Sequence, residues 1–127
     1  MSSLRTLKIA LVVSTLVGGP VLAQSNIALV FAGCVGRMSA EMEHAWLLGD
    51  PEADRHKALR STFLTLLDAT MPAGTGRDML NHRIDVKLAH SSLLTTARFE
   101  SDVERANAAK SIAVRHVSTC RKMLLDS

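Results

Sequence analysis

Apolar residues recur every three or four positions along most of the chain after its first quarter, which is the spacing of one face of a helix. Turn-forming or capping residues divide this pattern into four stretches, and these predict helices over about 27–48, 50–70, 77–98 and 101–125. The alternation and the β-branched clusters typical of strands are nearly absent. The pattern therefore predicts an all-α fold.

Each predicted helix has a stripe of positions that we expect to face the core. The second half of the stripe in the third helix is less regular than the rest. The four stripes are Cys34, Met38, Met42 and Ala45; Leu59, Phe63, Leu66, Leu67 and Thr70; Leu80, Ile84 and Leu88, with Leu93, Leu94 and Ala97 as the less regular half; and Ala106, Ala109, Ala113, Val117, Cys120 and Leu124.

Capping and turn residues set the predicted helix boundaries. Asp50 suits the start of the second helix, and the run MPAGTG over 71–76 predicts a linker. Ser101 and Glu104 have the spacing of a capping box for the fourth helix. No Gly or Pro separates the third helix from the fourth, so 77–125 also reads as one long helix. Because helices beyond about 25 residues are uncommon in compact domains, we predict a break.

The first 23 residues have the order of parts of a secretory signal peptide. Arg5 and Lys8 form a short positive region, 9–17 is largely apolar and uncharged, and Gly-Gly-Pro follows at 18–20. Small or modest side chains precede a cleavage point after Ala23. We therefore predict that residues 1–23 are a cleaved signal peptide and that the protein is exported, to the periplasm or out of the cell.

Cleavage at that point removes 23 of 127 residues and leaves 24–127 as a single helical domain of 104 residues. The alternative is an uncleaved membrane anchor that continues through the apolar patch 27–35. The polar residues 24–26 and the break before them argue against that anchor. The mature chain is therefore predicted to have no membrane span.

Charge and composition exclude one class of partner. The whole chain has 15 Lys and Arg against 12 Asp and Glu, and the signal peptide removes two of the cations and no acid. The mature domain is thus close to neutral. It lacks tyrosine, and aromatic residues make up only 3% of the chain. Because single-stranded nucleic acids are bound by basic surfaces with stacking aromatic side chains, we expect no nucleic-acid partner.

The two cysteines of a small exported domain are first read as a disulfide. In an up-down-up-down four-helix bundle, the first helix starts at the end where the fourth helix finishes. Cys34 lies early in the first helix and Cys120 late in the fourth, each on its apolar stripe. We therefore predict a small antiparallel bundle closed by a Cys34–Cys120 bond. Two alternatives remain: free thiols, and a lipid anchor at Cys34, where Phe31 to Cys34 resembles a bacterial lipoprotein cleavage box.

Met38 and His116 are the ligands of an alternative site, one for haem. Each lies four residues from a cysteine, toward the middle of the predicted bundle. Exported b-type cytochromes of the four-helix kind hold haem between a methionine of the first helix and a histidine of the fourth. The predicted disulfide argues against haem here. It would hold two Cα atoms about 5.5–6 Å apart one helical turn from where the haem must fit.

Met38, Met42 and His44 form the copper alternative, because thioether and imidazole ligands suit Cu(I). At about 100° per residue, however, His44 lies roughly 160° around the helix from Met42. Glu41 and His44 match half of a di-iron site, but such sites need a second Glu-x-x-His, which the chain lacks.

No catalytic pattern emerges from the sequence: it has no Gly-x-Ser-x-Gly, no His-Glu-x-x-His and no phosphate-binding glycine loop. We therefore expect a protein that is not an enzyme and holds no cofactor. The function expected is that of a non-catalytic binding or structural accessory protein of the cell envelope, acting on an unidentified protein partner. The alternative function is a redox or ligand carrier that holds haem or copper in the bundle.

Overall fold

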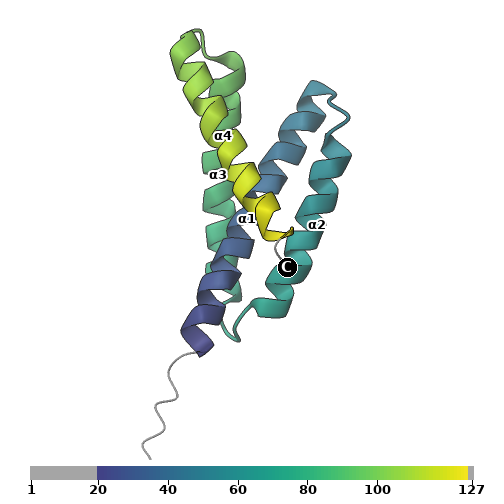
Figure 1. The fold of residues 1–127 in the computed structure, drawn as a ribbon, viewed down its shortest axis with the longest axis vertical. Helices are drawn as coiled ribbons and strands as arrows, with labels where there is room; N and C mark the ends of the chain where they lie inside the picture. The colour runs from purple at the N-terminus through teal and green to yellow at the C-terminus, as the bar shows by residue number, and fades with distance from the viewer. Residues whose placement is uncertain (1–19, 126–127) are drawn as a thin grey trace, which may run out of the picture.

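The computed structural model describes residues 20–125, which form four helices and no strand. They are α1 (Pro20–Leu48), α2 (Ala53–Thr70), α3 (Gly76–Phe99) and α4 (Val103–Met123). Short turns reverse the chain between successive helices (Figure 1). The all-α prediction is confirmed, including the break between the third and fourth helices. Most of the predicted signal peptide lies outside the described residues.

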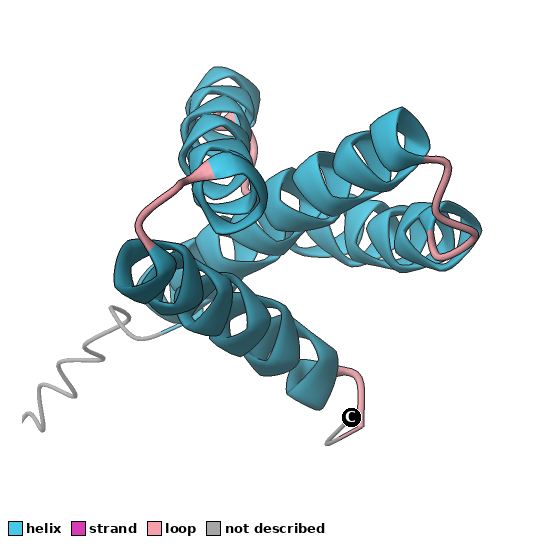
Figure 2. Ribbon diagram, turned by 90° about the horizontal axis from the view of Figure 1, so that it is seen from above, coloured by secondary structure: helices cyan, strands magenta, loops and turns pink. Residues whose placement is uncertain are grey.

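Helix α1 is the central element of the fold. It packs along its length against both α2 and α3, whereas α4 lies mainly on α3 and meets α1 over a short stretch (Figure 1). Among the described helices, α2 comes within 8 Å of neither α3 nor α4, measured between Cα atoms. In Figure 2 the helix that ends at the C-terminus accordingly lies apart from α2. The bundle is therefore open on the side of α1 that faces between α2 and α4.

The Cys34–Cys120 disulfide is present, as predicted, and holds the two Cα atoms 5.7 Å apart. It fastens the last turn of α4 to the first half of α1, the two helices with the shortest stretch of contact among those that touch. A sulfur atom in this bond cannot also carry a lipid, so the lipid-anchor alternative would require the bond to be absent. No helix among residues 20–125 is long and apolar enough to cross a membrane.

The core lies where α1 passes between its neighbours, and the predicted stripes of the first, second and fourth helices face inward. Phe63 is fully buried, and its ring centroid lies 6.3 Å from that of Phe31. Met38 and both cysteines belong to the same core cluster. Apolar periodicity was therefore a sound guide to the buried faces of these three helices.

The first part of the predicted stripe of the third helix is wrong, whereas its less regular second part, Leu93, Leu94 and Ala97, is half-buried. Leu80, Ile84 and Leu88 are 49%, 46% and 63% exposed, and the buried residues of α3 are Met79 and His90. Met79 and His90 are eleven residues apart, so they share one face, and the stripe of Leu80, Ile84 and Leu88 is rotated from Met79 by about 100–180°. The buried face of α3 thus includes a polar side chain, His90, whereas the exposed stripe is apolar.

Gly36 explains why α3 presents that face. A Cβ atom at Gly36 would lie 2.5 Å from the backbone oxygen of Arg83 and 3.1 Å from the backbone nitrogen of Lys87. The backbones of α1 and α3 therefore touch at this point. Large leucine side chains in the contact would force the two helices apart.

Replacing Gly36 with alanine is expected to destabilise the fold by about 1–2 kcal/mol. Overpacking costs about 1–3 kcal/mol, and the better helix propensity of alanine recovers at most about 1 kcal/mol. Gly33→Ala in the same helix is the matched control, because its Cβ would meet only the ends of side chains, the nearest at 3.4 Å. Urea denaturation of both variants measures the difference; equal midpoints would contradict the close approach.

The capping-box prediction for the fourth helix is wrong by one residue. The N-cap of α4 is Asp102, whose side chain accepts hydrogen bonds from the backbone N–H groups of Glu104 and Arg105 at 3.0 and 3.1 Å. An aspartate carboxylate caps as well as a serine hydroxyl, and its charge also suits the positive end of the helix dipole.

Candidate functional site

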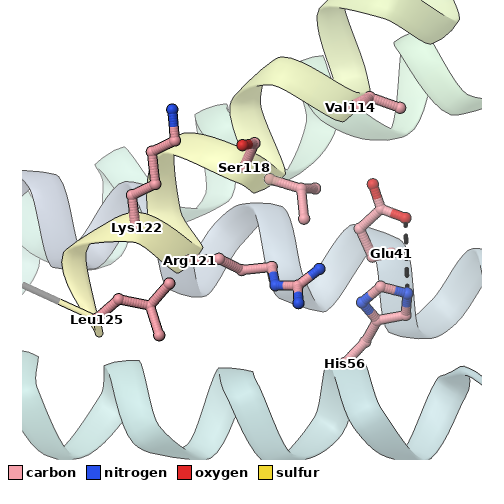
Figure 3. Close-up of a pocket in the computed structure, with 8 residues that line it drawn as sticks. Glu41, His56, Val114, Ser118, Arg121, Lys122 and Leu125 are labelled. Carbon is pink, nitrogen blue, oxygen red and sulfur yellow. Dashed lines mark ion pairs between the residues drawn. The ribbon is translucent and has the colours of Figure 1, made fainter.

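A groove opens between α2 and α4, with α1 as its floor (Figure 3). Its main part is a cavity of about 580 Å³, which is within the usual size range of sites for small ligands. The residues that line it are Glu41 from α1, His56 from α2, and Val114, Val117, Ser118, Arg121, Lys122 and Leu125 from α4 and the residues after it.

A second cavity of about 310 Å³ continues the groove along α2. Arg121 and Leu125 line both cavities, so the two parts form one surface, which we name the α2/α4 groove. The further lining residues of the second part are Arg55, Ala58, Leu59, Thr62 and Leu124.

The walls of the α2/α4 groove are largely apolar, and its charges are mostly positive. Val114 is 60% exposed and Leu125 82% exposed, so both leave apolar surface open to solvent. Figure 3 shows the side chain of Arg121 extending from α4 into the space between α4 and α2. Glu41 is the one acidic residue among those that line the groove.

Glu41 is held by two histidines. Its Oε1 lies 2.7 Å from Nε2 of His90, and its Oε2 lies 3.9 Å from Nε2 of His56. The ring of His116 packs against that of His90 with centroids 5.9 Å apart. Each of the four helices thus contributes one residue to this histidine–glutamate cluster, which lies at the floor of the groove.

The proton positions in this cluster follow from the carboxylate. An ionised carboxylate only accepts hydrogen bonds, so His90 donates to Glu41 through its Nε2–H. The Nδ1 atoms of His56 and His90 are buried and have no hydrogen-bond partner in the described structure. In a neutral imidazole that is protonated at Nε2, Nδ1 has no hydrogen and cannot donate a hydrogen bond. It therefore needs no buried acceptor beside it. The cluster therefore connects α1 to α2 and α3 beneath the groove.

His116 differs electrostatically from an exposed histidine. Burial lowers the pKa of His116, and the positive charge of Arg37, the neighbouring His90 and the charge of Arg115 lower it further. The folded protein therefore binds a proton at His116 less readily than the unfolded chain does. The contribution of His116 to stability is present above the pKa of the unfolded chain and declines as the pH falls below it.

We expect an NMR titration of the ring protons of His116 to give an apparent pKa below 6.5, the ordinary value for histidine. The same resonance in urea-unfolded protein provides the reference. A stability profile measured between pH 7.5 and 5.5 should fall less steeply in His116→Gln than in the wild type. An apparent pKa at or above the reference would contradict the burial of this ring beside Arg37.

The structure places the predicted haem and copper ligands in different surroundings. Met38 is fully buried in the apolar core, and Met42 is 7% exposed on the same side of α1. His44 is half-buried, and His116 contacts His90. Among residues 20–125, no group of three or more His, Cys, Asp or Glu side chains is positioned to hold a metal ion. The haem and copper sites stay alternatives drawn from the sequence.

Sequence reasoning associated Glu41 with the wrong histidine. The pattern Glu-x-x-His pairs it with His44 on the same helix, whereas its partners His56 and His90 come from α2 and α3. A weak signal existed, because His90 falls eleven residues after Met79 and so shares its buried face. Nothing in the sequence spacing identified His56.

Comparison of the chain with family models, curated proteins and solved structures found no match.

Proposed function

We propose that this chain is an exported, non-catalytic binding protein of the cell envelope, and that the α2/α4 groove is its binding site. The observation that carries the proposal is an open, mostly apolar cavity of about 580 Å³ with a few polar groups at defined positions. That combination is typical of sites for small molecules. An apolar groove left empty would expose surface that a soluble domain normally covers.

Two observations support export. The sequence begins with the pattern of a signal peptide, and the described fold contains a disulfide between its only cysteines. Disulfides persist in oxidising compartments such as the periplasm and are rare in the cytosol. A lasting Cys34–Cys120 bond therefore fits an exported protein.

In this proposal the histidine–glutamate cluster has a structural role: it stabilises the floor of the groove and takes part in no reaction. Its contacts join Glu41 to two other helices and fix the floor on which a ligand would lie. In the described structure, no hydroxyl or thiol forms a hydrogen bond with His56 or His90, so neither imidazole is paired with a nucleophile as covalent catalysis requires.

The export component is tested by the intact mass of protein from its native host, measured before and after reduction and alkylation. We expect a chain that begins at Gln24 and takes two alkyl groups only after reduction. A chain that begins at Cys34 with added acyl mass would overturn the proposal in favour of a lipoprotein.

The binding component is tested by native mass spectrometry of protein taken from the same source. We expect the wild type to carry a non-covalent ligand that is lost on denaturation, and Val114→Trp, which fills the groove, to carry none. Leu88→Trp is the matched control, because Leu88 is 63% exposed against 60% for Val114 and lies on α3 outside the groove. Equal bound mass in both variants, or none in the wild type, would overturn the proposal.

A further inference from the structure

We propose that the ligand of the α2/α4 groove is a single-chain amphiphilic anion, with its head group on Arg121 and its chain along the apolar wall formed by Val114, Val117 and Leu125. This inference rests on the proposed function and names the chemical class of the ligand. Three features of the groove support this ligand class: its charge, its apolar lining and its size.

The charge of the groove favours an anion. Arg121 and Lys122 line its main part, and Arg55 lines the adjoining part, where it pairs with Glu52 at 3.3 Å. The side chain of Arg121 makes no hydrogen bond or ion pair within the described part of the chain, and Figure 3 shows its guanidinium directed into the groove. A guanidinium binds carboxylate and phosphate groups through paired hydrogen bonds.

Glu41 does not cancel that preference. Its two carboxylate oxygens face His90 and His56, at 2.7 and 3.9 Å. Its side chain is only 17% exposed, so it offers little of its charge to a ligand above it. Arg121 is therefore the charged group most accessible to a ligand that enters between α2 and α4.

The apolar lining requires more than a small inorganic anion. Val114 and Leu125 are 60% and 82% exposed, and with Val117 they lie on the same side of α4 as Arg121, next to the groove. Covering apolar surface stabilises a complex by about 25 cal/mol for each Å² removed from water. A ligand with an alkyl chain gains this contribution, whereas a free phosphate or sulfate does not.

The size of the groove favours a single chain over a partner helix. A helix with its side chains is about 10–12 Å wide, so two turns occupy ~850 Å³ or more, which exceeds either part of the groove alone, and a rigid helix cannot bend from one part into the other. The main cavity has about 580 Å³ and the adjoining part about 310 Å³, with Arg121 and Leu125 at their junction. A flexible chain can follow both parts and place its head group at Arg121.

The test is isothermal titration calorimetry of the full mature protein with decanoate, decanol and decyltrimethylammonium, which share one alkyl chain and differ in charge. All three are kept below their micelle-forming concentrations. We expect decanoate to bind most tightly and the cation most weakly. Arg121→Gln should weaken decanoate binding about tenfold or more while leaving decanol unchanged, because a charged hydrogen bond is lost and the apolar wall is retained.

Arg115→Gln is the matched control, because Arg115 lies on the same helix but not among the residues that line the groove. It should bind decanoate as the wild type does, and Val114→Trp should bind neither decanoate nor decanol. The ligand class is overturned if Arg121→Gln and Arg115→Gln behave alike, or if the cation binds as tightly as decanoate. Binding to anionic phospholipid vesicles in preference to free decanoate would overturn it in favour of a membrane surface.

Failure of this inference is distinguishable from failure of the proposed function. If no decyl probe binds but native protein carries a ligand that Val114→Trp lacks, the groove is a binding site for another class of molecule. If native protein carries no groove-dependent ligand, the binding function itself is wrong.

Discussion

Replacing Cys34 and Cys120 together with alanine is expected to lower the free energy of unfolding by about 4–5 kcal/mol. The two residues are 86 apart in the sequence, so the bond closes a long loop and removes much conformational entropy from the unfolded chain. A domain of this size has a net stability of about 5–15 kcal/mol. The variant should therefore be close to unfolding at physiological temperature.

The packing of α4 makes the fold depend further on the disulfide. Helix α4 lies mainly on α3 and meets α1 over a short stretch, which includes the disulfide. Without the bond, α4 is free to separate from α1, and the groove loses one wall. The double variant should consequently lose ligand binding before it loses most of its helix.

Urea denaturation followed by circular dichroism measures the stability difference, and wild-type protein reduced with dithiothreitol is the control. Reduced wild type and the double variant should unfold at the same midpoint, well below that of the oxidised protein. A difference of less than about 1 kcal/mol between oxidised and reduced protein would show that the bond does not constrain the fold.

Phe63→Ala is expected to cost about 3–5 kcal/mol. Phe63 is fully buried on α2, with its ring centroid 6.3 Å from that of Phe31 on α1. Truncation removes apolar contacts and leaves a cavity between these two helices, and α2 packs on no other helix of the described structure that could close it. The loss should appear as a large drop in the midpoint of thermal unfolding.

Phe99→Ala is the matched control for this substitution. Phe99 is 67% exposed at the end of α3, so its truncation should change the free energy of unfolding by less than about 1 kcal/mol. Similar losses in the two variants would mean that α1 and α2 do not pack as described.

Helix count, most helix boundaries within a few residues and the disulfide were predictable from the sequence. The start of the first helix was wrong, because α1 begins at Pro20, seven residues before the predicted start, and continues through the polar residues 24–26. Apolar spacing located the helices, and the positions of Cys34 and Cys120 at one end of the predicted bundle gave the pairing. These features depend on local patterns and on chain order. The predicted N-cap of the fourth helix lay one residue too early, at Ser101 rather than Asp102, because both residues are good caps.

The orientation of the third helix was not predictable from its apolar stripe. Leu80, Ile84 and Leu88 form the more regular pattern, but the contact between α1 and α3 is set by backbone approach at Gly36. Glycine has no side chain, so a pattern of apolar side chains does not show where two helix backbones approach closely. The stripe that attracts attention in the sequence therefore lies on the surface.

The candidate site was even less accessible to sequence reasoning. Glu41 meets His56 and His90 only because three helices converge, and no spacing along the chain encodes that. The groove exists because α2 and α4 do not touch, and an absent contact has no sequence signature. Arg121 and Lys122 lie in the last turn of α4, where cations are favourable in any helix. Their positions in the sequence therefore do not indicate a binding site.

Methyl NMR of the mature, oxidised protein tests most directly whether the α2/α4 groove is the binding site. The methyl signals of Val114, Val117 and Leu125 report on the groove, and those of Leu80, Ile84 and Leu88 report on the other exposed apolar surface. On addition of small molecules extracted from the native host, we expect shifts confined to the first set. Shifts confined to the α3 stripe, or none in either set, would contradict it.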